Sequence, residues 1–343
     1  MKCSFPSCGR SVRARGLCIG HLGQERSGKA LTPLRAYKQA GRTDPDPSAS
    51  EVLSADDDWE QFRQWLGIRK RRGVAKKPAL DRRHGVRRFL VISDLHVPFH
   101  NLEAVTEAVE QGIRDKVDTC IIAGDFVDCY SLSRFVQYEA VPIKEEFVKA
   151  RTILEYASRN FTEVILLTGN HEERERKHFY QRLSQDEADW LLSKPMLERI
   201  SFDMANVTLA HRRLHDTDIR WFVQIGTDAV IGHPEVSSSV ALKPADKFRQ
   251  WAELWSDVYG FGRPRLLVIG HTHQAGTAWV GNCLIVENGC LCRFQGYALT
   301  PKLYGKPQRL AFTRFDQKDG KTIMASVRQY YPFADHPSQN ASH

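Results

Sequence analysis

The sequence has 343 residues, of which 42% are hydrophobic and 26% are charged, values that are ordinary for a globular protein. No stretch approaches the roughly 18 consecutive apolar residues of a transmembrane helix. The first residues, from Met1 to Pro6, lack the apolar segment of a secretory signal. We therefore expect an intracellular, cytoplasmic protein with no membrane partner.

Positive charge is concentrated in the N-terminal quarter of the sequence. The net charge is +8, but residues 1–88 hold 20 Lys and Arg against 9 Asp and Glu, and the remaining residues hold 29 against 32. The first 88 residues thus have a net charge of +11 and the rest have −3. This asymmetry predicts a basic appendage on a near-neutral body, with nucleic acid as its expected partner. Protein partners are unknown from the sequence.

Residues 1–43 are predicted to form a small zinc-binding module. Three cysteines and a histidine, Cys3, Cys8, Cys18 and His21, form a Cys3His set suited to one structural Zn²⁺. A module this short cannot fold on apolar burial alone, so a metal would stabilise it. The stretch from Cys3 to Gln24 is similar to short zinc-binding segments at the ends of phage and actinobacterial proteins, some of them nuclease-associated. If a phage encodes the chain, the expected location is the host cytoplasm. The alternative is that the four residues are unrelated and exposed.

Residues 44–88 are predicted to be a linker. Residues 44–58 are rich in Pro, Ser and Asp, as in solvated segments. A short amphipathic helix is expected next, because four apolar residues recur at helical spacing, namely Trp59, Phe62, Trp65 and Leu66. Residues 69–88 then carry ten Lys and Arg against one acid. This run could neutralise phosphates of a nucleic acid, or it could be a solubilising linker.

From residue 89 to residue 343 the sequence predicts a single α/β domain. Five short apolar runs indicate strands that are buried on both faces: 89–92, 120–123, 164–167, 229–231 and 266–269. Two apolar stripes at helical spacing lie between the first three runs: Leu102, Val105, Val109 and Ile113, then Ile143, Phe147, Ala150 and Leu154. Strands that alternate with helices in this way predict a layered core with parallel strands.

Metal-binding side chains follow each of the five apolar runs. The segments that follow are Asp94-Leu95-His96, Gly124 to Asp128, Gly169 to Glu172, Gly232-His233, and Gly270 to His273. Because ligands gather at the carboxyl ends of strands in α/β sheets, we expect these side chains to converge. Oxygen and imidazole donors without thiolates suit Mn²⁺, Fe or Zn²⁺. There are more donors than one ion can use, which predicts two ions.

The five motifs DLH, GDFVD, GNHE, GH and GHTH, in this order, resemble those of the calcineurin-like metallophosphoesterase family. The resemblance covers about residues 88–300. It implies a four-layer α/β/β/α sandwich with the metal ions at one edge of its two sheets. It also implies two divalent ions, for which Mn²⁺ is the first expectation and Fe or Zn²⁺ are alternatives.

The resemblance also implies a role for each residue of the site. One ion would be held by Asp94, His96 and His273. The other would be held by Asn170, His233 and His271, and Asp125 would bridge the two ions. His171 matches the general acid that protonates the leaving oxygen, and Asp128 would orient it from behind.

The expected reaction is hydrolysis of phosphodiester bonds, and the basic N-terminal region favours nucleic acid, hence a nuclease. Alternatives are a phosphodiesterase for cyclic or small nucleotides, a protein phosphatase, or a nucleic-acid-binding protein with an inactive phosphoesterase body. Glu172 could belong to the site or simply favour a helix start. The polar segment from Glu172 to Gly232 could cap the site or be a solvated surface. Three late cysteines are predicted to be buried thiols: Cys283, Cys290 and Cys292.

Overall fold

A computed structural model of the chain describes residues 2–6, 8, 17, 21, 24–25, 30, 85–133, 141–192, 194–214, 217–238, 240–259, 262–293 and 308–333. The chain divides into two compact units, one within residues 1–60 and one within residues 61–343. No helix in the described ranges is both long and apolar enough to cross a membrane.

The larger sheet of the second unit has seven strands: β1 (Val86–Ile92), β2 (Thr119–Ala123), β3 (Glu163–Leu167), β4 (Val207–Leu209), β12 (Phe312–Lys318), β13 (Lys321–Thr322) and β14 (Arg328–Tyr330). Its order is β13-β12-β1-β2-β3-β4, and β14 also pairs with β12. Strands β1 to β4 run parallel, whereas β12 is antiparallel to β1.

The smaller sheet has five strands: β7 (Phe222–Ile225), β8 (Ala229–Gly232), β9 (Leu266–Ile269), β10 (Ala275–Val280) and β11 (Cys283–Asn288). Its order is β10-β11-β9-β8-β7, with β8, β9 and β11 parallel and both edge strands antiparallel. A separate two-stranded ribbon pairs β5 (Arg212–Leu214) with β6 (Thr217–Ile219).

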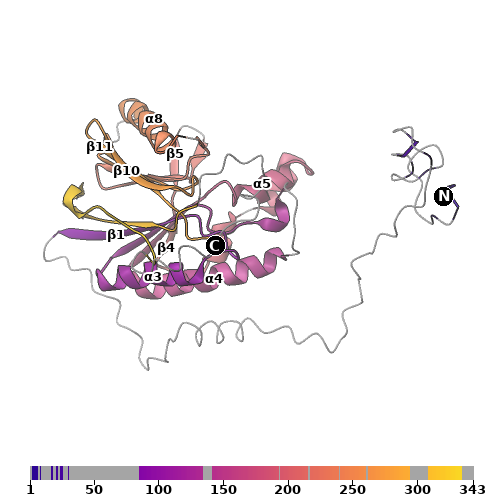
Figure 1. The fold of residues 1–343 in the computed structure, drawn as a ribbon, viewed down its shortest axis with the longest axis horizontal. Helices are drawn as coiled ribbons and strands as arrows, with labels where there is room; N and C mark the ends of the chain where they lie inside the picture. Colours follow the sequence, from indigo (N-terminus) through magenta and orange to yellow (C-terminus); the bar gives the residue numbers. More distant parts are fainter. Residues whose placement is uncertain are drawn as a thin grey trace, which may run out of the picture. The chain divides into compact units, whose positions relative to one another are not determined.

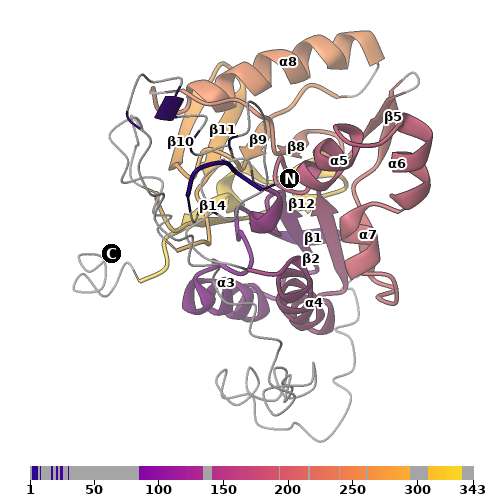
Figure 2. The same ribbon diagram turned by 90° about the vertical axis from the view of Figure 1, so that its right-hand side faces the viewer.

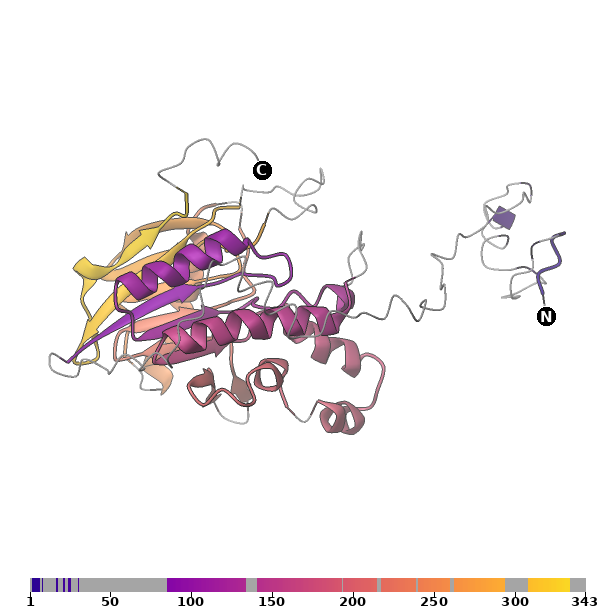
Figure 3. The same ribbon diagram turned by 90° about the horizontal axis from the view of Figure 1, so that it is seen from below.

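Helices cover the outer faces of both sheets. Helices α3 (Leu102–Arg114), α4 (Ile143–Asn160) and α7 (Met196–Ile200) pack on the larger sheet, and α8 (Lys243–Tyr259) packs on the smaller one. Figure 1 and Figure 2 show this succession from α3 and α4 through the two sheets to α8. Figure 3 shows α3 and α4 lying side by side across the larger sheet. The predicted four-layer α/β/β/α sandwich is confirmed.

Four short helices complete the described structure of this unit. They are α5 (Glu173–Tyr180), α6 (Gln185–Leu191) and two 3-10 helices, η2 (Tyr130–Leu132) and η4 (Met324–Ser326).

The central strands are buried on both faces, which explains their unbroken apolar runs. In β1, Leu90 and Ile92 pack toward the helices, whereas Phe89 and Val91 pack between the two sheets. Strands β2 and β3 alternate in the same way, and β9 alternates between the sheet interface and α8. Full burial of each large side chain contributes about 1.5–3 kcal/mol. All five predicted strands and both predicted helices are therefore confirmed.

The first strand begins before the predicted start of the domain. Because β1 begins at Val86, the last two arginines of the basic run are strand residues. The Arg87 guanidinium donates to Glu163 Oε2 at 2.8 Å and to Thr119 Oγ1 at 2.9 Å, so it is engaged within the sheet. The rest of the basic run, residues 44–58 and the predicted helix near Trp59 lie outside the described residues.

Candidate metal centre

The predicted ligands lie in loops at the carboxyl ends of five strands. Strands β1, β2 and β3 supply them from the larger sheet, and β8 and β9 from the smaller sheet. Five of the seven predicted ligands have a positive φ: Asp94 (54°), His96 (49°), Asp125 (47°), His271 (78°) and His273 (53°). Such backbone conformations are costly for residues other than Gly and concentrate at functional sites. The loops are thus bent to aim side chains at a shared point.

The first predicted ligand set comes together around His273. Its Nε2 atom lies 3.3 Å from Asp94 Oδ1 and 3.0 Å from His96 Nε2. All three residues are at least nine-tenths buried. The ligand atoms of Asp94 and His96 also lie within 4.8 Å of one another and of an Asp125 oxygen, so oxygen and imidazole donors can contact one ion together.

The second predicted set comes together around the side-chain oxygen of Asn170. This oxygen lies 2.7 Å from His271 Nδ1 and 3.3 Å from His233 Nε2. The other ring nitrogen of His233, Nδ1, donates to the main-chain oxygen of Ala123 at 2.8 Å. That bond leaves Nε2 directed at the site, as is usual for histidines that bind metals.

The Asp125 carboxylate lies between the two sets. Its Oδ2 atom is 3.1 Å from His233 Nε2 in one set and 3.8 Å from His96 Nε2 in the other. Its Oδ1 atom accepts the main-chain N–H of His171 at 2.9 Å. One carboxylate therefore contacts both sets, which is the position that a bridging ligand needs.

The charge balance of the centre suits bound cations. Asp94 and Asp125 are 0% and 2% exposed, and no Lys or Arg in the described ranges forms an ion pair with either. Burial alone would lower the pKa of His233 and His273, but Asp125 raises the first to about 10 and Asp94 raises the second to about 9. Buried carboxylates require a positive partner. Two divalent ions would supply it, so the donor set fits the metals that the resemblance implies.

His171 lies beside this centre with both ring nitrogens engaged. Its Nδ1 atom donates to the main-chain oxygen of Asp128 at 3.0 Å, and Asp128 Oδ1 lies 3.5 Å from the same nitrogen. The other carboxylate oxygen of Asp128 is 3.1 Å from His96 Nδ1. Asp128 therefore contacts both histidines, and its closest contact with His171 is made by the main chain.

Arg174 is a component of the site for which the sequence left two interpretations open. Its guanidinium donates to Asp128 Oδ1 at 3.1 Å and to the main-chain oxygen of the same residue at 2.9 Å. The second amino group lies 2.8 Å from His171 Nε2. A guanidinium has only donors, so Nε2 accepts in this arrangement. This arginine of the polar segment thus belongs to the site, one helical turn after the predicted general acid.

Glu172 connects two of the ligand loops. Its carboxylate accepts the main-chain N–H groups of Val127 and Gly169, each at 2.8 Å, and the residue is 5% exposed. Burial is the main cause that raises its pKa to about 7. The sequence showed an acid at this place but not its partners, because Val127 is 45 residues away. Glu172 holds together the loops after β2 and β3.

Two residues after β11 contact His273, and the sulfur of one of them, Cys292, also lies within 4.8 Å of a ring nitrogen of His96. The Gln308 amide nitrogen lies 2.6 Å from His273 Nδ1, and Cys292 Sγ lies 4.0 Å from it. These contacts orient the ring so that Nε2 is directed at Asp94. The prediction of buried late thiols is confirmed, since three cysteines are at most 2% exposed: Cys283, Cys290 and Cys292.

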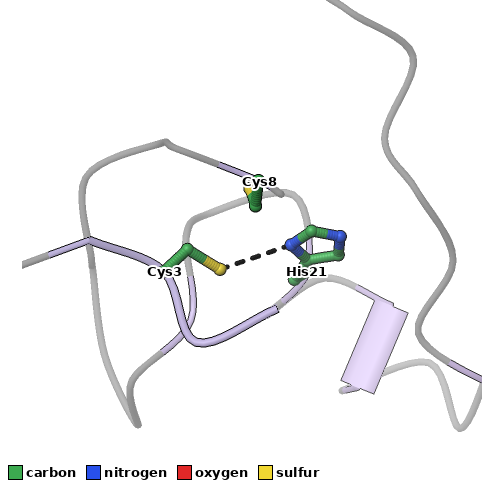
Figure 4. Close-up of side chains that lie close together, drawn as sticks. All are labelled: Cys3, Cys8 and His21. Carbon is green, nitrogen blue, oxygen red and sulfur yellow. Dashed lines mark hydrogen bonds between the residues drawn. The ribbon is translucent and has the colours of Figure 1, made fainter. Parts of the chain in front are cut away.

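Three of the four predicted zinc ligands of the N-terminal unit lie close together. Cys3 Sγ is 3.4 Å from His21 Nδ1, and the ligand atoms of Cys3, Cys8 and His21 are all within 4.8 Å of one another (Figure 4). His21 is fully buried, and the ring of Phe5 packs 4.1 Å from its ring. Cys18, the fourth predicted ligand, lies outside the described residues.

The chain is similar to one known protein family and to several solved structures. The sequence model of the calcineurin-like phosphoesterase family matches residues 87–275, more than half of the chain. Similar solved structures include an archaeal phosphodiesterase (15% identity, TM-score 0.32, covering 71% of this chain and 99% of that one). Another is Vps29 of Chaetomium thermophilum (13% identity, TM-score 0.35, covering 68% of this chain and 85% of that one). A third is Vps29 of Entamoeba histolytica complexed with Zn²⁺ (13% identity, TM-score 0.34, covering 71% of this chain and 97% of that one). No curated protein sequence matches. With the five motifs assembled at one edge of a four-layer sandwich, the chain belongs to the calcineurin-like phosphoesterase family.

Proposed function

We propose that the chain is a phosphodiesterase that uses two divalent metal ions and acts on nucleic acid. The observation that carries this proposal is the position of Asp125 between two sets of donors. Asp94, His96 and His273 would hold one ion, and Asn170, His233 and His271 the other. When bound, two such ions supply Lewis-acid activation of the phosphoryl group and of the attacking water. Mn²⁺ is the first candidate, and Fe or Zn²⁺ fit the same donors.

The residues around the centre would handle the leaving group. His171 is the proposed general acid, and the bond from its Nδ1 to Asp128 fixes the ring so that Nε2 meets the leaving oxygen. In this structure an Arg174 N–H donates to that same nitrogen. In the substrate complex, phosphoryl oxygens replace His171 as acceptors of the Arg174 N–H groups. The guanidinium then stabilises the charge that develops on the phosphoryl group.

Nucleic acid is the proposed substrate because of the charge distribution along the chain. Residues 1–88 have a net charge of +11, whereas the phosphoesterase part has −3. A basic, zinc-stabilised N-terminal region would hold a polyanion near the centre through phosphate contacts that do not depend on sequence. A second candidate is a cyclic or small-nucleotide phosphodiesterase, since the same centre can hydrolyse a small diester. Two alternatives remain: a protein phosphatase, and a nucleic-acid-binding protein whose phosphoesterase body is inactive.

The deciding experiment compares substrates in the presence of Mn²⁺. Single- and double-stranded DNA, RNA, 2′,3′- and 3′,5′-cyclic nucleotides, a phosphopeptide and bis(p-nitrophenyl) phosphate would be tested with the full chain. A second protein would carry Gln in place of all four basic residues at 69–72. We expect the full chain to cleave a nucleic-acid polymer. At low salt the Gln changes should slow this cleavage and have little effect on hydrolysis of bis(p-nitrophenyl) phosphate.

Each alternative predicts a different result in that comparison. Efficient turnover of a cyclic nucleotide that does not respond to the Gln changes would favour the second candidate. Preference for the phosphopeptide would make the chain a protein phosphatase. Metal binding without hydrolysis of any of these substrates would contradict enzymatic function.

A further inference from the structure

A large cleft in the second unit begins at the candidate metal centre. Its volume is about 1150 Å³, and its lining includes Asn170 and His233 of the second ligand set. The rest of its wall comes mainly from helices α5, α7 and α8 and from the segments before α7, before β7 and after β8. Pockets for single small ligands have about 300–1000 Å³. A cleft of this size that is continuous with the centre can accept a substrate longer than one nucleotide.

Aromatic side chains form one wall of this cleft. The ring centroids of Trp221 and Trp251 are 5.1 Å apart, and Phe248 lies 5.4 Å from Trp221. Both tryptophans line the cleft, and each is only partly buried, so part of each remains open to a ligand. The main-chain oxygen of Trp221 accepts the N–H of His233 at 2.8 Å. This bond holds the main chain of Trp221 beside that of His233, a predicted metal ligand.

A cation accompanies an aromatic ring on each of two helices that line the cleft. On α5, the Arg176 guanidinium lies 5.1 Å from the centroid of the Tyr180 ring. On α8, the exposed Lys247 precedes Trp251 by four residues, so the two share one helix face. No ion pair within the described part of the chain engages Lys247. On each helix a cationic side chain thus lies next to an aromatic one, and on α8 the cation is the exposed Lys247.

Acidic side chains of the lining do not cancel these cations, because most already have partners. Four of the five have partners: Glu172 bonds main-chain N–H groups, Glu175 pairs with Arg199, Asp218 with His211 and Arg220, and Glu235 with Lys177. Among the described residues of the lining, Lys247 is therefore a positive charge that these acids do not pair with.

We propose that this cleft binds an unpaired polynucleotide strand next to the scissile phosphodiester. Bases stack on Trp221 and Trp251, and a flanking phosphate pairs with Lys247. Aromatic platforms beside backbone cations are how proteins hold single strands without reading their sequence. A duplex hides its base faces in its own stack, so this wall discriminates against it. The inference rests on the proposed function and narrows its substrate to single-stranded nucleic acid.

Binding of a labelled oligonucleotide tests the cleft independently of hydrolysis. The full-length protein would be titrated at 150 mM salt, to weaken contacts of the basic N-terminal region, with a fluorescein-labelled 12-nucleotide single strand and the matching duplex. Trp251→Leu removes the aromatic face but keeps an apolar side chain, and Trp251→Phe restores an aromatic face. Trp279→Leu is the matched control, since Trp279 is 57% exposed on β10 and does not line the cleft.

We expect Trp251→Leu to raise the Kd for the single strand about tenfold, as for the loss of one base stack, and Trp251→Phe to recover most of the affinity. Lys247→Gln, at an exposed position of α8, should weaken binding several-fold. Trp279→Leu should bind as the unchanged protein does. Turnover assays compare kcat/KM for the oligonucleotide with kcat/KM for bis(p-nitrophenyl) phosphate. The ratio of the first to the second should fall in Trp251→Leu and in Lys247→Gln.

Several results would overturn this inference. One is duplex binding as tight as single-strand binding, and another is an unchanged Kd in both Trp251→Leu and Lys247→Gln. Binding of a phosphopeptide that depends on Trp251 would assign the cleft to a protein substrate. Failure to hydrolyse bis(p-nitrophenyl) phosphate with any metal would contradict the proposed function, whereas the binding titration would still decide what the cleft holds.

Discussion

A methyl group at Gly270 should disrupt the metal centre from within. The Cβ of Gly270→Ala would lie 2.8 Å from Asp94 Oδ2, 2.8 Å from His233 Nδ1 and 2.9 Å from the main-chain oxygen of Ala123. The last two groups are hydrogen-bonded to each other at 2.8 Å, so the methyl group would separate them. Ordinary contacts of a Cβ begin at about 3.4 Å, so each neighbour must move by about 0.5 Å.

Both side chains that must move are predicted ligands, one from each set. Overpacking of this kind costs about 1–3 kcal/mol of stability. Because a misplacement of about 1 Å can reduce turnover about 10²-fold, we expect a loss of about tenfold to 10²-fold in kcat/KM. The measurements are metal content per chain by mass spectrometry, hydrolysis of bis(p-nitrophenyl) phosphate with Mn²⁺, and unfolding in urea.

Gly276→Ala provides the matched control for this prediction. Its Cβ would meet only Leu242 Cδ2 at 3.8 Å, an ordinary contact, and neither glycine has the positive φ that would strain an alanine. We expect this control to keep its metal content and turnover. If Gly270→Ala bound as much metal as Gly276→Ala and hydrolysed bis(p-nitrophenyl) phosphate as fast, the close packing deduced for the centre would be wrong.

Three further changes test other parts of the site and the fold. His171→Ala should leave metal content intact and reduce turnover by on the order of 10²–10⁴; an equal loss of metal would make His171 a ligand. Arg174→Gln should reduce kcat/KM about tenfold or more for phosphodiesters, whereas Arg159→Gln on the exposed face of α4 should not. Glu146 is buried and accepts the Tyr130 N–H at 3.0 Å, and burial raises its pKa from 4.5 to about 7. Protonated Glu146 stabilises the fold fully below pH 4.5, and this stabilisation is lost as the pH rises through 7. The unfolding free energy of the wild type should therefore fall by about 3 kcal/mol over this range, whereas that of Glu146→Gln should not. Urea unfolding at pH 4.5 and pH 8 measures this, and parallel changes in both proteins would contradict it.

The sequence predicted the layers because burial on both faces leaves an unmistakable trace in a strand. In β1, neighbouring residues such as Leu90 and Val91 face different apolar layers, so both must be apolar. The site could be predicted for a related reason. Each ligand follows its strand by only a few residues, and parallel strands deliver their carboxyl ends to one edge.

The supporting contacts could not be predicted, because they join residues that no local pattern connects. Glu172 reaches Val127 in a loop 45 residues earlier, and Gln308 reaches His273 from 35 residues later. Arg174 was visible as one arginine in a polar segment, and only the fold placed it against His171. Side chains of this kind carry no periodicity and no spacing rule.

The sequence by itself determined the α/β layers, the family motifs and the residues that can hold metal ions, since these depend on burial patterns and on short-range order along strands. The tertiary structure alone decided the surroundings of that centre. Trp221 lies just before β7 and Trp251 lies 30 residues later on α8, so their rings become neighbours only when α8 packs on the smaller sheet. A surface made of distant segments depends on how the layers pack, and packing is a property of the whole chain rather than of any window within it.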